Sequence, residues 1–342
     1  MTGGHVPTSA VIDVLTPIWQ RVLHQPSIGL EDSFFDLGGN PSSAVELFTE
    51  LARVGYRELS PLTIYQAPTI AALAALLERP ATPRLPPLVL LKAGTVEPPV
   101  FIAHGLGGSV MEFFQLVRHI RSRHSIYGMQ AKGVDGVDKP LDRIEDMAQF
   151  YLDAIRQIQP RGPYVFMGYS LGGLVTLEMA QRLSESGERL SLLVMVDSYP
   201  HFRYLPLAQR ASVVARRLKR YASASRQRGE SRSRTSQDDT GGVPNRPQFA
   251  ESFERAMRLV RDSAHRAWTH YQPRFYKGTI KFVRAEIPTE FADDAVAAWG
   301  KLAGEFAVEA VPGDHLGMLT THFESLGAVL SRYLAEAFGE RT

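Results

Sequence analysis

The sequence predicts an α/β protein in which helices cover both faces of a mainly parallel sheet, preceded by a small all-helical bundle. Three observations support this fold class. From residue 88 onward, short apolar runs alternate with helical patterns, as in parallel sheets that are buried on both faces. Residues 8–79 instead show apolar residues at helical spacing. A proline-rich stretch over 79–87 separates the two patterns, so we expect two domains.

Composition narrows the classes of function. The 342 residues are 44% hydrophobic and 22% charged, as in ordinary globular proteins, and the formal net charge of +2 does not indicate nucleic acid binding. The absence of cysteine excludes disulfides, a thiolate nucleophile and a cysteine-based zinc site, and it fits a cytoplasmic location. No apolar run approaches the roughly 20 residues that span a bilayer, and the first residues lack a secretory signal pattern. We therefore expect a cytoplasmic protein with no metal and with neither a membrane nor a nucleic acid as partner.

Residues 8–79 are expected to form three helices around one apolar core. The loop 27–40 separates the first two helices, and Thr69 is a good N-cap for the third. The apolar positions expected on the inner faces are Val11, Leu15, Ile18, Val22, Val45, Phe48, Leu51, Ala52, Ile70, Leu73, Ala74 and Leu77. A domain of about 75 residues is small but large enough to fold alone.

The stretch Asp32–Asn40, together with Pro61–Leu77, resembles a peptidyl or acyl carrier domain of the nonribosomal peptide synthetase type. The resemblance implies a 4′-phosphopantetheine arm on the serine that follows the Gly-Gly-Asp/His/Asn triplet. Here Pro41 occupies that position and Ser42 follows it. The carrier is therefore degenerate at its most important residue.

Two interpretations of this departure are open. In the first, Asn40 caps a helix, Pro41 stands at its first position, and a phosphopantetheinyl transferase modifies Ser42 one residue late. The phosphate would then lie at a helix N-terminus, a placement worth about 0.3–1 kcal/mol. In the second, the shift of one residue, about 100° around the helix, prevents modification, and the carrier is an inert docking module.

Residues 80–97 are expected to form the linker and the start of the second domain. The proline-rich Arg79–Pro87 favours an extended conformation of about 3.1 Å per residue, or roughly 28 Å in all. A semi-rigid spacer of this length suits a carrier that moves between sites while tethered.

The motif that organises the second domain is Gly-Tyr-Ser-Leu-Gly-Gly at 168–173. It lies between an apolar run of strand length and a helix-forming run, as a G-x-S-x-G nucleophile elbow does. The turn places the serine in a strained conformation, and side chains at the flanking glycines would collide with neighbouring backbone. Ser170 is therefore predicted to be an exposed nucleophile above the carboxyl edge of the sheet.

An acid and a base follow in the order that such a site requires. Asp197 ends the apolar run 192–196, and His315 lies in a loop between the last expected strand and the final helix. Asp314 is the rival acid, but adjacent side chains usually diverge, so we interpret it as a loop or cap residue. His104 ends another strand beside the Gly-rich loop, and we expect it to shape that loop rather than to act as the base.

These residues predict acyl transfer. His315 takes the proton from Ser170, Asp197 holds the imidazole, and the serine attacks a carbonyl. The resulting oxyanion needs two backbone donors, for which we expect the amides of Leu171 and of Leu106.

Residues 98–340 resemble a type I thioesterase domain, a member of the α/β-hydrolase family that ends nonribosomal peptide or polyketide assembly lines. The matching residues are Gly168–Gly173, Asp197-Ser198, Trp299 and Val311–His315. The resemblance implies release of an acyl or peptidyl chain from a phosphopantetheine thioester, by hydrolysis or macrocyclisation, in secondary-metabolite biosynthesis. It implies upstream synthetase modules or carrier proteins as partners, either in the same natural chain or acting in trans. Gly105 stands where the family usually has proline, which leaves the donor from this loop less certain.

The interval from about 200 to 275 is expected to be the lid over the site. Two helices are expected in it, one near Val213 and one from Phe253 to Ala264, with a disordered segment over 223–246. Between Arg203 and Arg234 there are ten basic residues and one acid. We interpret this run as a solvated exterior, with recognition of the carrier phosphate or of an acidic substrate as the sharper alternative.

Two other functions compete with thioester release. A general carboxylesterase or lipase would use the same serine chemistry and would prefer oxygen esters. A docking protein would combine an inert carrier with a vestigial hydrolase, a hypothesis that Pro41 favours and the complete serine–acid–histidine set disfavours.

Overall fold

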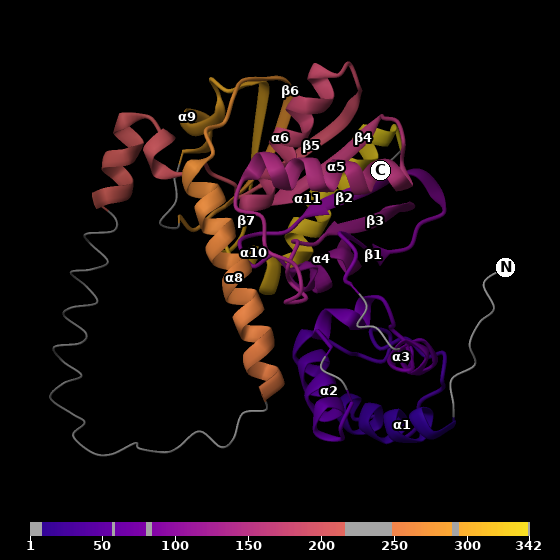
Figure 1. Cartoon of the computed structure of the whole chain (residues 1–342). Helices are drawn as coiled ribbons and strands as arrows, with labels where there is room; N and C mark the ends of the chain where they lie inside the picture. The colour runs from indigo at the N-terminus through magenta and orange to yellow at the C-terminus, as the bar shows by residue number, and fades with distance from the viewer. Residues whose placement is uncertain (1–8, 57–58, 80–83, 216–247, 289–293, 341–342) are drawn as a thin grey trace, which may run out of the picture.

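The computed structural model describes residues 9–56, 59–79, 84–215, 248–288 and 294–340. A helical bundle precedes an α/β body (Figure 1). The bundle consists of α1 (Ser9–Leu23), α2 (Pro41–Arg53), the 3₁₀ helix η1 (Pro61–Tyr65) and α3 (Ile70–Leu77). Its core includes Trp19 and Phe34, whose rings meet edge to face at 5.3 Å. Thr69 caps α3, as predicted, because its side chain accepts a hydrogen bond from the Ala72 amide.

The body contains a seven-stranded sheet in the order β1-β3-β2-β4-β5-β6-β7. Its strands are β1 (Leu88–Lys92), β2 (Val96–Ala103), β3 (His124–Met129), β4 (Tyr164–Tyr169), β5 (Leu190–Val196), β6 (Tyr276–Ala285) and β7 (Ala303–Val311). Only β1 pairs antiparallel among the described strands, which confirms a mainly parallel sheet. The strand predicted from Val100 begins earlier, at Val96, and passes through two prolines. The register shifts between Val96 and Val100, and proline is tolerated at such an irregularity because no ladder donor is lost there.

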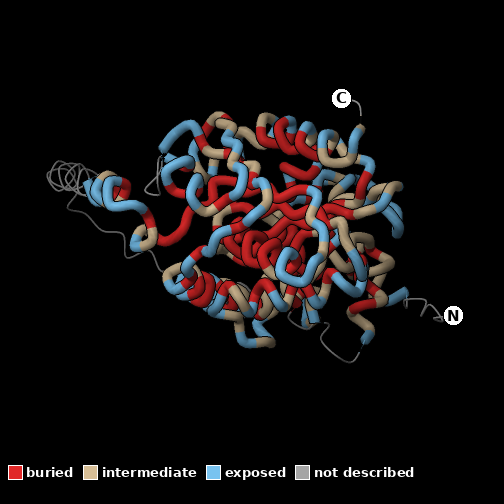
Figure 2. Tube along the Cα trace, turned by 90° about the horizontal axis from the view of Figure 1, so that it is seen from above, coloured by how far each residue is buried: buried red, intermediate tan, exposed pale blue. Residues whose placement is uncertain are grey.

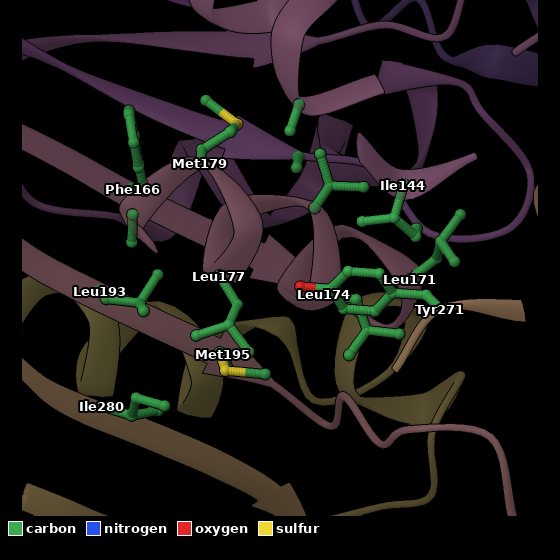
Figure 3. Close-up of a cluster of buried hydrophobic side chains, with 14 of the residues drawn as sticks. Ile144, Phe166, Leu171, Leu174, Leu177, Met179, Leu193, Met195, Tyr271 and Ile280 are labelled. Atoms are coloured by element: carbon green, nitrogen blue, oxygen red, sulfur yellow. The ribbon is translucent and has the colours of Figure 1, made fainter. Parts of the chain in front are cut away.

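Helices cover both faces of the sheet. One face carries α5 (Ile144–Ile158) and α6 (Leu171–Glu185), and the other carries α4 (Phe114–His119) and α11 (Phe323–Phe338). Alternate residues of β4 face the two helix layers: Phe166 packs towards α5 and α6, whereas Met167 packs towards α11. Figure 3 shows the first of these clusters, with Ile144 and Leu174 among its labelled side chains. The buried strands run through the middle of the molecule and the exposed helix faces lie outside (Figure 2).

Short elements complete the body: η2 (Val110–Phe113), η3 (Phe202–Tyr204), α9 (Ala295–Trp299) and α10 (Gly317–Thr320). The helix predicted near 112–121 is therefore split into a 3₁₀ turn, η2, and the short α4. Ser109 caps η2 by accepting a hydrogen bond from the Met111 amide.

The interval between β5 and β6 holds a helical segment over 207–215 and the long helix α8 (Gln248–His270). Two helices were expected here. The predicted disordered segment and most of the basic run lie in 216–247, outside the described residues. In Figure 1, α8 extends from the body to the bundle, where it contacts α2.

The bundle also packs directly on the body. The Phe35 ring lies 5.5 Å from the Phe114 ring of α4, and Arg118 Nη1 donates to the Phe35 carbonyl at 3.5 Å. Nearer to α8, Leu62 of η1 is fully buried against Val134 and Val260.

Candidate active site

Ser170 occupies the tight turn between β4 and α6. Its backbone has φ 53° and ψ −119°, a conformation that L-residues rarely adopt. A Cβ on Gly168 would lie 2.3 Å from the Gly172 carbonyl oxygen, and a Cβ on Gly172 would lie 2.3 Å from the Ala103 carbonyl oxygen. Both glycines are thus required by close backbone approach, as the motif predicted.

Three segments far apart in the chain bring Ser170, His315 and Asp197 into one chain of hydrogen bonds. His315 Nε2 lies 3.0 Å from Ser170 Oγ, and His315 Nδ1 lies 2.7 Å from Asp197 Oδ2. Because a carboxylate accepts, Nδ1 carries the hydrogen and Nε2 is left to accept the serine proton. This is the geometry of a nucleophile, a general base and an orienting acid.

The acid is fixed by backbone as well as by the imidazole. Asp197 is buried, and its Oδ1 accepts from the Ala285 amide at 3.2 Å. Trp299, also fully buried, donates to the carbonyl of the next residue, Ser198, at 2.9 Å. Asp314 instead accepts from the Gly317 amide at 2.7 Å, the loop role that was predicted for it.

Tyr169 supports the histidine from the other side. Its ring stacks on the His315 ring at 4.8 Å, and its hydroxyl donates to the His315 carbonyl at 2.7 Å. Burial raises the pKa of this phenol well above its usual range, so it stays a neutral donor.

The Gly-rich loop 104–108 lies beside the elbow. His104 is fully buried, with Nδ1 2.6 Å from the Gly105 carbonyl and Nε2 2.7 Å from the Tyr151 hydroxyl. Since a carbonyl only accepts, Nδ1 is the protonated nitrogen and Nε2 accepts from the tyrosine. Burial lowers the pKa of His104 to about 4, so the ring is neutral and shapes the loop, as predicted.

Leu106 and Leu171, the expected sources of oxyanion donors, both line the small cavity beside Ser170. Asp197, Tyr199 and Trp268 complete its wall, and its volume is about 10 Å³. Such a space holds about one water molecule. Trp268 comes from α8, and its indole nitrogen donates to the Tyr199 carbonyl at 3.0 Å.

Sequence reasoning missed Tyr169, Trp268 and Glu112. Tyr169 lies inside the motif, where its position next to the serine could have marked it. Glu112, in η2, is half-buried and accepts the Gly105 amide at 2.5 Å, but its spacing in the sequence is that of an ordinary helix acid. Trp268 lies on α8, and the periodicity of the sequence does not show where that helix lies relative to Ser170.

Ser42 lies on the helical bundle, apart from this site, in the first turn of α2. Asn40 caps the helix by accepting the amides of Ser42 at 2.9 Å and Ser43 at 3.1 Å, and Pro41 has no amide hydrogen. The Ser43 hydroxyl completes a capping box with Asn40 and is buried, whereas Ser42 is exposed. Ser42 is thus the accessible hydroxyl. A phosphate on it would be stabilised by the helix dipole, while the adjacent amides remain bonded to Asn40.

The described residues contain no cluster of three or more histidine or acidic side chains arranged to bind a metal ion. None of the helices in the described ranges combines the length and apolar character that a membrane crossing demands.

Two protein-family models match this chain. Residues 98–335 match the thioesterase domain, and residues 13–77 match the phosphopantetheine attachment site. The chain is 38% identical over 207 residues to a dimodular nonribosomal peptide synthase of Bacillus subtilis (strain 168), covering 60% of this chain and 9% of that protein. It is 35% identical over 184 residues to indigoidine synthase of Streptomyces lavendulae, covering 53% and 14%. The chain therefore spans a small fraction of these relatives' length.

Solved structures share the fold. The four-domain nonribosomal peptide synthetase holo-AB3403 matches all of this chain with a TM-score of 0.59 at 21% identity, over 27% of its own length. The Vlm2 thioesterase domain, solved with a bound dodecadepsipeptide, matches 72% of this chain and 97% of itself with a TM-score of 0.51 at 21% identity. The body thus has the predicted α/β-hydrolase fold. The chain belongs to the thioesterase domain family, with a carrier-type phosphopantetheine attachment region ahead of that domain.

Proposed function

We propose that this chain releases an acyl or peptidyl group from a phosphopantetheine thioester through an acyl-enzyme on Ser170. The observation that carries the proposal is the continuous hydrogen-bonded chain from Ser170 through His315 to Asp197. Residues 98–340 would form the releasing domain with a lid over about 200–275, 8–79 the carrier, and 80–97 the connection.

The reaction proceeds in two halves. Ser170 Oγ attacks the thioester carbonyl while His315 Nε2 takes its proton, and the tetrahedral intermediate collapses by breaking the C–S bond. His315 then returns the proton to the leaving pantetheine sulfur. In the second half His315 takes a proton from water, or from an internal amine or hydroxyl of the acyl chain, and finally gives it to Ser170. Water yields a free acid, and an internal nucleophile yields a macrocycle.

The amides of Leu171 and Leu106 are the proposed donors to the oxyanion in both halves. Both residues line the cavity at Ser170, and Leu171 begins α6, so its amide belongs to a helix N-terminus. Loss of one such donor costs about 3–4 kcal/mol in other enzymes.

The test of the mechanism compares the wild-type protein with Ser170→Ala. We expect the wild type to hydrolyse an acyl-pantetheine thioester faster than the matching oxygen ester, and Ser170→Ala to release no product above background. Release by Ser170→Ala would disprove the acyl-enzyme. A large preference for the oxygen ester would instead favour a general carboxylesterase.

We further propose that Ser42 carries the phosphopantetheine, because it is the exposed hydroxyl at the start of α2. The experiment is intact mass after incubation with coenzyme A and a broad phosphopantetheinyl transferase. We expect a mass shift in the wild type and in Ser43→Ala, and no shift in Ser42→Ala. An unmodified wild type would support the inert docking module.

A further inference from the structure

Glu112 is a half-buried acid outside the serine–histidine–aspartate chain. It lies in η2, seven residues after Gly105, and its Oε1 accepts the Gly105 amide at 2.5 Å. Among the described residues, no basic side chain is bonded to it. Partial burial of a carboxyl group without a cation beside it is costly, and the hydrogen bond that it accepts from the Gly105 amide offsets part of that cost.

The Gly105 peptide groups are held from two directions. Glu112 holds the amide, while the carbonyl accepts from His104 Nδ1 at 2.6 Å and from the Gly108 amide at 3.2 Å. The Gly105 carbonyl and the Leu106 amide belong to one planar trans peptide, so they point in opposite directions. Fixing the carbonyl towards His104 therefore fixes where the Leu106 N–H points.

Glycine has the freest backbone of all residues, so such restraint must come from outside it. A side chain on residue 105 would restrict the backbone, but its Cβ would lie only 3.1 Å from the Tyr169 ring. The hydrogen bond that Glu112 accepts from the Gly105 amide restrains the backbone without this close contact. Ser109 caps η2, and Phe113 of η2 is buried in the core of the body, so the body itself keeps this turn in place.

We propose that Glu112 is a positioning residue that holds Gly105 so that the Leu106 amide points at the oxyanion. This inference rests on the proposed function, since it assigns a task within the same acyl transfer. Burial raises the pKa of Glu112 to about 8, against the opposing effect of the Gly105 amide, so near pH 7 it is mostly neutral. A neutral acid holds the loop without placing a negative charge close to the developing oxyanion.

The test uses Glu112→Gln, which keeps an acceptor oxygen, and Glu112→Met, which has similar length and no such oxygen. On a soluble acyl-pantetheine thioester we expect kcat of Glu112→Met to fall about tenfold to a hundredfold, with KM within about twofold. We expect Glu112→Gln to stay within about threefold of wild type. The inhibition constant of a trifluoromethyl ketone, which forms a tetrahedral adduct with the serine, should rise in parallel with the loss of kcat.

Wild-type kcat in a folded Glu112→Met, or equal losses in both variants, would overturn the proposal. If Glu112→Met does not fold, Glu112→Ser makes the same comparison, because serine is too short to reach the Gly105 amide. Ser170→Ala measured alongside separates the two hypotheses: activity that survives Ser170→Ala refutes the acyl-enzyme, whatever the Glu112 variants do.

Discussion

Ser170 combines a strained backbone with neighbours that stabilise it. Its amide donates to the Val196 carbonyl at 2.9 Å, and the flanking glycines admit the close approach of α6 to β4. Asp197, which holds the histidine, also has a positive φ, of 42°. Two strained residues on adjacent strand ends aim both side chains at His315, and strain that persists in this way is typical of functional sites.

The first residue-scale prediction separates the two neighbouring acids of the site. Asp197→Asn should lower kcat for thioester hydrolysis by about 10³–10⁴, because an amide does not hold the imidazole in the required tautomer. Asp314→Asn is the matched control. It should stay within about threefold, since asparagine can still accept the Gly317 amide. Steady-state kinetics measures this difference, with circular dichroism to check folding. Equal loss of kcat in the two variants would contradict the assignment of Asp197 as the acid that orients His315.

The second residue-scale prediction concerns how Glu112 makes the free energy of unfolding depend on pH. Its folded-state pKa of about 8 lies above the usual value of an unfolded glutamate, 4.5. Between these values the unfolded chain gives up a proton that the folded chain keeps. The contribution of Glu112 to the free energy of unfolding is therefore fully present below pH 4.5 and is lost as pH rises through 8. Two titratable groups beside the same loop, the phenol of Tyr169 and the imidazole of His104, are neutral across this window.

Thermal unfolding from pH 5 to pH 8.5 measures this loss. The Tm of the wild type should fall more steeply with pH than the Tm of Glu112→Gln. The exposed Glu324, in the first turn of α11, gives the control: Glu324→Gln should follow the wild type. Parallel curves for wild type and Glu112→Gln would show that Glu112 titrates normally.

At the scale of elements, the sequence predicted most strands and helices of the body because buried parallel strands are almost uniformly apolar. Residues 192–196 and 164–167 are examples, and both lie in the buried middle of the sheet. The places of Asp197 and His315 beside Ser170 were also predictable, since their positions at strand ends follow from the fold class. Glu112 and Trp268 were not, because their roles depend on which loop each one meets in space. The local pattern of an amphipathic helix carries no such information.

The helix α8 supplies the wall residue that narrows the site. Trp268 is half-buried, meets the His201 ring edge to face at 4.7 Å and lines the cavity at Ser170. Trp268→Ala should therefore raise kcat/KM for long acyl thioesters relative to acetyl thioester by about tenfold, the scale on which one or two methylenes are discriminated in apolar pockets. Trp268→Phe, which keeps an aromatic wall, should retain most of the wild-type preference. An unchanged chain-length profile in Trp268→Ala would place the acyl chain elsewhere.

At the scale of the whole molecule, the helical bundle meets the hydrolase at α4 and at α8. Phe35 meets Phe114 on α4, and Leu62 meets Val260 on α8. The hydrogen bonds that join Ser170, His315 and Asp197, by contrast, lie entirely within the body. Because Leu62 packs across the boundary and not in the bundle core, it is a position at which docking can be disturbed without unfolding either part.

Leu62→Arg should release the bundle from the body. Burial of a leucine side chain is worth about 1.5–3 kcal/mol, and an unpaired buried cation adds a further penalty. In the variant, ¹⁵N relaxation should give the bundle a shorter rotational correlation time than the body, whereas both should tumble together in the wild type.

Leu30→Arg, at a bundle position that is 42% exposed, is the control and should behave as wild type. Turnover of a soluble thioester should stay within about twofold in both variants, because its chemistry needs only the body. Joint tumbling in Leu62→Arg would mean that the remaining contacts, among them that between Phe35 and Phe114, are enough to hold the bundle. Loss of turnover in Leu62→Arg but not in Leu30→Arg would mean that the bundle supports the site itself.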